Sequence, residues 1–519
     1  METYVPALYA TAFSLLPPLV AIVLALITKE VYFSLFLGII TGALLYANGN
    51  PLVAFKEMLF NEEGGLVASI TNGSHARILI FCALLWMIVS IINRSGSARA
   101  FGKWAQKHIK SKTGAMLSTA FMGLIIFVDD GFNCMTVGSV MRPITDRFKV
   151  SRAKLAYILD STAAPVCIIA PISCWAAAVS YSVPQEMGIN GFDMFVQAIP
   201  YNLYALSTLF LLFLLIATKT DYGPMKKHEE NAAKGDLFTS GEPPYDEVIN
   251  AKDVKEGKIS NLLLPIIVLI VTCVGGMLYT GGFFEGVPVR EALADADSAT
   301  GLVIGAVLTL IFTFFLYMIR RALTFKEFMS CIPAGFRSIV SAMLILILAW
   351  NLTGMTGLLG TSEFVNMAVN GFASGLQMFL PAIIFLIAVF MAFSTGTSWG
   401  TFSILIPIVC AVFQTSPQML IISISACLAG SVCGDHCSPI SDTTILSSAG
   451  AQSNHLNHTT TQIPYAMTAA AASFIGYLLM GILGYTTGNA VSLLALPVTL
   501  ALLAAIVLFI RKREHKKVA

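Results

Sequence analysis

Long apolar runs recur along the whole chain and constrain its fold more strongly than any other feature of the sequence. A helix needs about 20 apolar residues to cross a bilayer. Only 12% of the 519 residues are charged, compared with about 25% in soluble domains. Because a helix satisfies its own backbone hydrogen bonds in lipid, the sequence predicts an all-α polytopic membrane protein whose main partner is the lipid bilayer.

The apolar runs divide into simple spans and interrupted ones. Two segments with polar centres, 114–140 and 376–413, are expected to form re-entrant or broken-helix hairpins, and 419–452 is expected to be a broken span. Short interfacial helices are expected at 51–60 and 96–110. The remaining spans are expected near residues 6–28, 31–47, 78–94, 155–181, 195–217, 261–281, 299–319, 336–353, 463–487 and 490–510.

Lysine and arginine are unevenly distributed among the connections, which predicts the orientation of the chain. Basic clusters occupy connections such as 94–112 and 142–154, whereas 182–194 and 354–375 contain neither residue. Since basic connections of membrane proteins remain in the cytoplasm, we expect a multi-pass protein of the cell inner membrane with a cytoplasmic C-terminus. The two hairpins are then entered from opposite sides of the membrane.

Opposite insertion of the hairpins predicts an inverted repeat. A weak internal similarity agrees with it, because Val166-Cys167 and Val432-Cys433 are each followed by the sequence Pro-Ile-Ser. Inverted repeats with interrupted helices are typical of secondary transporters, whose sites lie near the midplane. The first membrane half is expected at residues 1–217 and the second at 261–510. A polar and partly disordered cytoplasmic linker, 218–260, is expected between them, and a basic cytoplasmic tail at 511–519.

The stretch Gly434–Thr444 places two carboxylates, a histidine and several hydroxyls directly after an apolar run. Such groups are costly in hydrocarbon and normally face a bundle interior or a water-filled cavity. A surface loop is the alternative, but the next polar stretch, 454–458, already provides one. A metal site built from Cys433, Asp435, His436 and Cys437 is the other alternative, although a second ligand pair is missing.

Polar groups also interrupt the first half. Asp129 and Asp130, followed by Asn133, break an apolar run. Adjacent carboxylates cannot both ionise cheaply in a low dielectric, so this pair is expected to hold a proton or bind a cation. Asp160-Ser161-Thr162 lies in a second apolar run. The alternatives are a solvated interfacial turn for the pair and a simple helix cap for Asp160.

The second hairpin contains a run of hydroxyls and glycines, Ser394–Thr401. Hydroxyls and freed carbonyls are hard oxygen ligands suited to a dehydrated alkali cation. Small residues that allow close packing of helices are the alternative. The ten cysteines lie in or beside apolar runs and are interpreted as buried apolar residues.

The run Gly434–Ser448 resembles the hallmark of the NhaC-type sodium/proton antiporter family, within the ion transporter superfamily. Asp129-Asp130, Asp160–Pro165 and Gly396–Thr401 also resemble the pattern of this family, as does Met141–Asp146. The resemblance implies an inner-membrane secondary transporter, not an enzyme, that exchanges Na⁺ for H⁺. The family also includes exchangers that couple ions to malate or lactate, so the resemblance alone does not fix the substrate.

The mechanism expected from these residues is competition for shared carboxylates. A buried aspartate holds a proton or helps to coordinate Na⁺, and a conformational shift changes the side that the site faces. Na⁺ is placed at Asp435, Asp442 and Thr397; His436 relays protons or fixes a neighbouring carboxylate. Na⁺ and H⁺ are the coupling ions, and no other cofactor is expected. The predicted ion- or substrate-binding residues are Asp129, Asp130, Asn133, Asp160, Ser161, Thr162, Thr395, Thr397, Ser398, Asp435, His436, Ser438, Ser441 and Asp442.

Three other functions remain open from the sequence. The first is a Na⁺- or H⁺-coupled exchanger of a small organic anion, such as malate or lactate, or of an amino acid. The others are an intramembrane hydrolase using Ser438 or Ser441 with His436, for which no triad geometry is evident, and a passive channel. The expected partner is a small ion or a carboxylate. No nucleic acid is expected, because no basic patch suits one. A homodimer with a second copy of the chain is an alternative.

Overall fold

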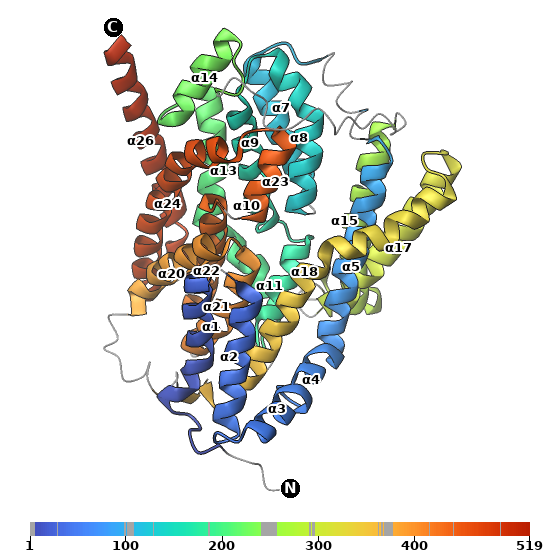
Figure 1. The fold of residues 1–519 in the computed structure, drawn as a ribbon, viewed down its shortest axis with the longest axis vertical. Helices are drawn as coiled ribbons and strands as arrows, with labels where there is room; N and C mark the ends of the chain where they lie inside the picture. Colours follow the sequence, from blue (N-terminus) through green and yellow to red (C-terminus); the bar gives the residue numbers. More distant parts are fainter. Residues whose placement is uncertain are drawn as a thin grey trace.

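A computed structural model gives the fold of the chain as a bundle of helices (Figure 1). Seven described helices are long and apolar enough to cross a membrane, or ten if each of three bent pairs is counted as one span. The chain is therefore an all-α polytopic membrane protein, as predicted. The structure describes all residues except 1–5, 29, 98–99, 101–107, 128, 185–186, 240–256, 290–291, 293–295, 362, 365–366, 368–376, 415, 440, 488 and 519.

The first part of the chain forms two apolar helices and a long span, joined by two short helices. A 3₁₀ turn at Ala12–Leu15 precedes the first helix, so the helical part of the expected span 6–28 begins only at Leu16. The segment expected to be an interfacial helix at 96–110 lies largely outside the described residues. The helices are α1 (Leu16–Thr28), α2 (Val31–Tyr46), α3 (Pro51–Phe60), α4 (Leu66–Thr71) and α5 (Gly73–Arg94).

The rest of the first half is more fragmented than predicted. The expected span 155–181 is three short helices, because Pro165 and Pro171 lack the amide hydrogen that a continuous helix needs. Ser173 then starts the third of these helices by accepting a hydrogen bond from Ala176 N at 3.1 Å. The helices are α7 (Lys112–Ile125), α8 (Asp130–Arg147), α9 (Arg152–Ser161), α10 (Ala164–Cys167), α11 (Cys174–Ser182), α12 (Gly191–Ala198) and α13 (Leu203–Thr218).

The predicted linker contains an ordered helix, α14 (Pro224–Lys234). Met225 and Ala232 are buried on its inner face, and Glu229 accepts a hydrogen bond from Ser151 N at 2.8 Å. This stretch of the linker, which was predicted to be partly disordered, is ordered because an apolar face and a buried carboxylate attach it to α9. Residues 240–256 lie outside the described part of the chain.

The second half contains the second hairpin and the broken span at the predicted places. A peripheral pair, α15 and α17, packs against α5 and projects from the bundle (Figure 1). The helices are α15 (Ile259–Thr280), α17 (Ser298–Ile319), α18 (Phe325–Gly357), α20 (Leu380–Thr395), α21 (Ser398–Val412), α22 (Pro417–Cys437), α23 (Asp442–Ala451), α24 (His455–Thr486), α25 (Asn489–Ser492) and α26 (Ala495–Val518). The last of these carries the basic tail as a continuation of the helix.

Helix α22 forms the centre of the second half. Of its apolar window, 83% is buried, the largest share among the seven spans. Gly430 and Gly434 bring it against α20, because a Cβ atom at either residue would lie within 2.4 Å of a carbonyl oxygen of α20. No side chain larger than hydrogen fits there, so the two glycines fix the distance between the helices.

The two broken spans pack reciprocally. Helix α23, from the second half, packs against α8 of the first hairpin, whereas α11, from the first half, packs against α21 of the second hairpin (Figure 1). At the first contact a Cβ atom on Gly138 would lie 2.5 Å from the carbonyl carbon of Gly450. The backbones of α8 and α23 are therefore in direct contact, and each half completes the hairpin region of the other.

Candidate functional site

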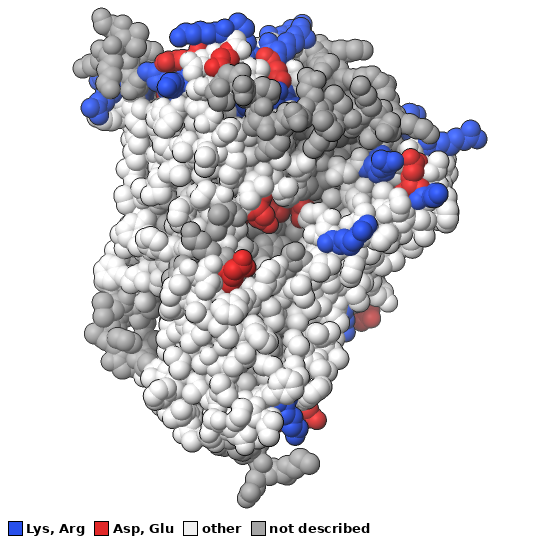
Figure 2. Space-filling model, viewed as in Figure 1, with Lys and Arg blue, Asp and Glu red and all other residues white. Residues whose placement is uncertain are grey.

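A cavity of about 340 Å³ lies where the hairpins and the broken helices meet. It is lined by the α7–α8 connection, the α20–α21 connection, the end of α22 and the start of α23, with α5, α11 and α18 completing the wall. Figure 2 shows acidic side chains at mid-height, with a basic side chain to their right, well below the charged upper end of the molecule. Most of the surrounding surface in this view is uncharged.

Four of the predicted aspartates converge on this cavity: Asp129, Asp130, Asp435 and Asp442. They come from both halves of the chain. Glu30 lines it as well, so five carboxylates share one space. Within the described lining there is no lysine, arginine or histidine. Like charges that share one low-dielectric cavity repel one another, so the cavity requires cations or protons to neutralise it.

The first hairpin presents its two aspartates where the helices break. Helix α7 ends at Ile125 and α8 begins at Asp130. Asp130 Oδ1 accepts a hydrogen bond from Gly131 N at 3.0 Å. Asp129 is only 2% exposed, and the Cys174 thiol of α11 donates to its Oδ2 at 3.6 Å. The carboxylates are thus held at the start of a helix, where the partial positive charge stabilises them.

Asn133 contacts the ends of α7 and α9 next to this break and does not line the cavity. Its side-chain amide is fully buried and donates to Gly123 O at 2.8 Å and to Thr162 O at 2.7 Å. The amide therefore satisfies carbonyl groups that are freed where α7 and α9 end. Asn133 is a positioning residue in this structure.

The second hairpin turns at Gly396, whose φ of 70° is a left-handed conformation that suits glycine. Thr397 then caps α21 by accepting a hydrogen bond from Gly400 N at 3.3 Å. Thr395, Thr397 and Ser398 all line the cavity. These residues of the hairpin therefore line the same cavity as the carboxylates, and their role as neutral oxygen ligands stays a prediction.

Asp435 lies near the end of α22 and is only 2% exposed. Its Oδ2 accepts a hydrogen bond from Ser398 Oγ at 2.8 Å, whereas its Oδ1 has no hydrogen-bond partner. A buried carboxylate oxygen that accepts no hydrogen bond lowers the stability of the folded state. Asp435 Oδ1 is therefore available to bind a cation. Asp442, the first residue of α23, is exposed within the cavity and accepts from Thr443 N at 2.9 Å.

Asp160 and its neighbours lie behind the cavity in a separate buried network. Asp160 Oδ2 accepts hydrogen bonds from Gln462 Nε2 at 2.6 Å and from Thr444 Oγ1 at 3.2 Å. His458 Nε2 lies 3.8 Å from the same oxygen. Since Thr443 lines the cavity and Thr444 contacts Asp160, the first turn of α23 lies between the two groups.

The other predicted residues also lie outside the cavity lining. His436 Nδ1 is 2.8 Å from Tyr204 Oη, and its Nε2 is 3.4 Å from Ser161 Oγ. Thr162 Oγ1 donates to Ile158 O at 2.8 Å, within its own helix. The two serines act as local supports. Ser441 caps α23 by accepting from Thr444 N at 3.4 Å, and Ser438 Oγ donates to Phe393 O of α20 at 2.7 Å.

Several polar residues of the site were not predicted from the sequence. Residues 454–458, predicted to be a surface loop, begin α24, and His458 is fully buried; that prediction is wrong because Ser448 and Gln462 supply hydrogen-bond partners. Gln462 lies one turn further along the same helix, and it ends the polar stretch 457–462, so no apolar surroundings marked it in the sequence. The cavity wall also contains Trp86 and Trp175, which come from distant helices.

No set of three or more His, Cys, Asp or Glu side chains in the described ranges is arranged to hold a metal ion. All ten cysteines are free and buried. The cysteines near Asp435 therefore pack as apolar side chains in this structure, and the oxygen groups of the cavity are the available ligands.

Interrupted helices that meet at an acidic cavity in an apolar bundle define the class of this protein as a membrane transporter. Residues 182–482 match the Na⁺/H⁺ antiporter family. Over 487 residues, 91% of each chain, the sequence is 39% identical to an uncharacterised protein of Haemophilus influenzae. The chain belongs to the Na⁺/H⁺ antiporter family, which confirms the resemblance seen in the sequence.

Two further proteins are similar in part. The malate-2H⁺/Na⁺-lactate antiporter of Bacillus subtilis is 27% identical over 172 residues, which cover 31% of this chain and 36% of that one. The crystal structure of the Alcanivorax borkumensis YdaH transporter has a TM-score of 0.50 at 13% identity and covers 86% of this chain and 91% of that chain. At this identity the likeness concerns the fold alone.

Proposed function

We propose that this protein exchanges Na⁺ for H⁺ across the cytoplasmic membrane by alternating access. The observation that carries the proposal is the convergence of five carboxylates on one cavity whose described lining has no basic side chain. Buried carboxylates must be protonated or paired with cations. A hard alkali cation suits the oxygen groups of the cavity, and Na⁺ is the cation named in the family description.

Competition between the cation and protons then couples the two fluxes. The unpaired Oδ1 of Asp435, the exposed carboxylate of Asp442 and the hydroxyl of Thr397 form the Na⁺ site. Protonation of either carboxyl group removes a negative ligand and weakens Na⁺ binding. Such a site carries Na⁺ or a proton in alternation, which is what exchange requires.

Reciprocal packing of the broken spans supports alternating access. Each wall of the cavity combines a helix break from one half with a broken span from the other. In transporters with inverted repeats, the site lies between two such units, and movement of one against the other changes the side that it faces. The inverted repeat predicted from the sequence is part of this proposal.

A chain of polar groups offers protons a path to Asp160. His455 is half-buried at the start of α24. Its Nδ1 lies 3.0 Å from Ser448 Oγ, which lies 2.9 Å from Nδ1 of the buried His458. The other ring nitrogen of His458 is 3.8 Å from Asp160. Imidazoles and hydroxyls can both donate and accept protons, so this chain links the surface to the region behind the cavity.

Proteoliposomes with an imposed pH gradient and an internal pH-sensitive dye test the exchange. Na⁺ should dissipate the gradient, and Asp435→Asn should abolish this effect. Glu62→Gln is the control, since Glu62 is an exposed carboxylate outside the cavity. Full activity of Asp435→Asn would remove this residue from the ion site, and no response of the unsubstituted protein to Na⁺ would refute Na⁺/H⁺ exchange.

The proton path has a matched pair of variants on one helix. Ser448→Ala breaks the link between His455 and His458, whereas Ser447→Ala removes a hydroxyl that lies 3.0 Å from Cys134 Sγ. The first should slow Na⁺-driven proton flux at least tenfold while Na⁺ binding by the detergent-solubilised protein is unchanged. Equal flux in the two variants would rule out this path.

A second candidate is exchange of an organic substrate coupled to Na⁺ or H⁺. A cavity of about 340 Å³ is much larger than a single ion needs. Trp86, Trp175 and Trp399 line it beside the carboxylates, and tryptophan faces with carboxylates attract an ammonium group. An amino acid therefore fits better than a dicarboxylate, although the partly similar Bacillus subtilis protein is named for malate and lactate. Thermal stabilisation by one of these compounds, and none by Na⁺ alone, would favour this candidate.

We also propose that the charged end of the molecule faces the cytoplasm of the cell. Lysine and arginine side chains gather at the upper end in Figure 2, where the C-terminus also lies in Figure 1. Positive residues of membrane proteins are retained on the cytoplasmic side. Labelling of a single cysteine placed at Lys512 only after the inner membrane of right-side-out vesicles is permeabilised would support this orientation, and labelling of intact vesicles would contradict it.

A further inference from the structure

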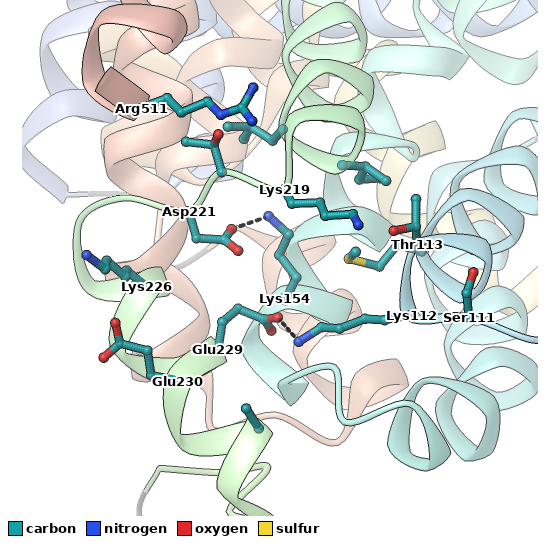
Figure 3. A pocket seen from close by; sticks show the side chains of 15 residues that line it. Ser111, Lys112, Thr113, Lys154, Lys219, Asp221, Lys226, Glu229, Glu230 and Arg511 are labelled. Atoms are coloured by element: carbon teal, nitrogen blue, oxygen red, sulfur yellow. Dashed lines mark hydrogen bonds and ion pairs between the residues drawn. The ribbon is translucent and has the colours of Figure 1, made fainter. Parts of the chain in front are cut away.

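A second cavity, of about 680 Å³, lies at the charged end of the molecule, away from the acidic site. It is bounded by the start of α7, by α9, by the end of α13, and by α14 and α26 (Figure 3). None of its lining residues lines the acidic cavity. Its chemistry is therefore not explained by ion exchange at the aspartates.

The second cavity carries an excess of positive charge. Five basic and three acidic side chains line it, which gives a formal charge of +2: Lys112, Lys154, Lys219, Lys226, Arg511, Asp221, Glu229 and Glu230. Two of the acidic groups are already engaged (Figure 3). Asp221 pairs with Lys154 at 2.7 Å, and Glu229 pairs with Lys112 at 2.6 Å.

Lys219 and Arg511 are the basic groups available to a ligand. Both are exposed, and neither forms an ion pair with another residue in the described ranges. In Figure 3 the side chain of Lys219 extends across the cavity toward Thr113. Lys219 directly follows α13 and Arg511 lies in α26, and both line the same cavity.

The wall adds a helix N-terminus and apolar surface, whereas the buried Lys154 is neutralised by Asp221. Lys154 is 2% exposed, and its ammonium group lies 5.4 Å and 5.0 Å from the ring centres of Tyr157 and Tyr465. The N-terminus of α7 also opens into the cavity at Ser111, and helix N-termini attract anions. Met116, Leu215 and Ile216 line the remainder. The cavity thus combines an anion-attracting end with an apolar wall.

We propose that this cavity binds a phosphate-bearing anion through Lys219 and Arg511. A phosphate group matches paired Lys and Arg donors, and basic pockets between membrane helices bind anionic head groups at the cytoplasmic surface. An anionic phospholipid and free phosphate share this chemistry. The phospholipid also fills the apolar wall with its acyl chains. The proposal does not depend on which ion the acidic cavity carries.

The test measures thermal unfolding of the full chain in uncharged detergent during titration with phosphatidylglycerol, phosphatidylcholine or sodium phosphate. Phosphatidylglycerol should raise the unfolding temperature more than phosphatidylcholine does. The double variant K219Q/R511Q should bind it roughly 30-fold more weakly, since each of the two basic groups near a membrane surface contributes roughly fivefold. K512Q/R513Q is the matched control, because it removes two exposed charges of the same helical tail that do not line the cavity.

Each outcome either distinguishes a phospholipid from free phosphate as the ligand or contradicts the proposed site. Stabilisation by phosphatidylglycerol but not by sodium phosphate assigns a lipid head group, whereas equal stabilisation by both at matched ionic strength assigns free phosphate. Equal weakening in K219Q/R511Q and K512Q/R513Q would show that only diffuse charge attracts the lipid, which overturns the proposal. A wild-type protein that responds to none of the anionic probes overturns it as well.

Discussion

Gln462 is the residue whose replacement tests the buried network most directly. Its Nε2 donates to Asp160 Oδ2 at 2.6 Å and to His436 O at 2.5 Å, and its Oε1 lies 2.8 Å from His458 Nε2. Gln462→Leu keeps the volume of the side chain and removes all three contacts. Asp160 Oδ2 retains the hydrogen bond from Thr444, but His436 O and His458 Nε2 lose the partner they have in Gln462.

Two buried polar groups without partners cost about 1–3 kcal/mol each, so Gln462→Leu should lower the free energy of unfolding by roughly 2–6 kcal/mol. The measurement is reversible unfolding of the purified protein in mixed micelles, followed by tryptophan fluorescence. Gln197→Leu is the control, since Gln197 is exposed and bonds only to Asp193; its effect should remain within about 0.5 kcal/mol. A loss below about 1 kcal/mol in Gln462→Leu would refute the role of this residue in joining the three helices.

Three further outcomes follow from contacts described above. Asn133→Ala should destabilise the protein by about 1–3 kcal/mol for each of its two carbonyl partners, measured in the same unfolding assay. Gly450→Leu should sharply reduce the yield of monodisperse protein in size-exclusion chromatography, because a Cβ there would lie 2.4 Å from Cys134 O. Burial, then the nearby Lys227, lowers the pKa of His228 on α14 from 6.5. The folded state therefore holds fewer protons than the unfolded state, so thermal stability should fall as the pH drops below about 6.5, and less steeply in His228→Gln.

The sequence predicted the interruptions of the helices because their causes are local. Glycine, proline and carboxylates within apolar runs marked the breaks at Asp129, at Gly396 and after Cys437, and these breaks meet at one cavity. The division of 155–181 into three helices was missed, although Pro165 and Pro171 indicated it. A periodic apolar pattern gives the extent of a span more reliably than its continuity.

Contacts between residues far apart in the chain could not be predicted from the local sequence. Asp160 has the same local pattern as the cavity aspartates, but the first turn of α23, a segment almost 300 residues away, separates it from the cavity. Similarly, the polar start of α24 could be exposed or buried according to its sequence, and Ser448 and Gln462 decide that His458 is buried. Such outcomes depend on which helix packs next to the residue, and one sequence does not contain that information.

The direct backbone contact between Gly138 of α8 and Gly450 of α23 has a mechanical consequence. With no side chains between them, the two segments have no deformable layer at this contact, so we expect them to move together. If the proposed alternating access takes place, the parts that move against one another would then differ from the N-terminal and C-terminal halves of the chain. The first hairpin would carry the carboxylate of Asp442 with it.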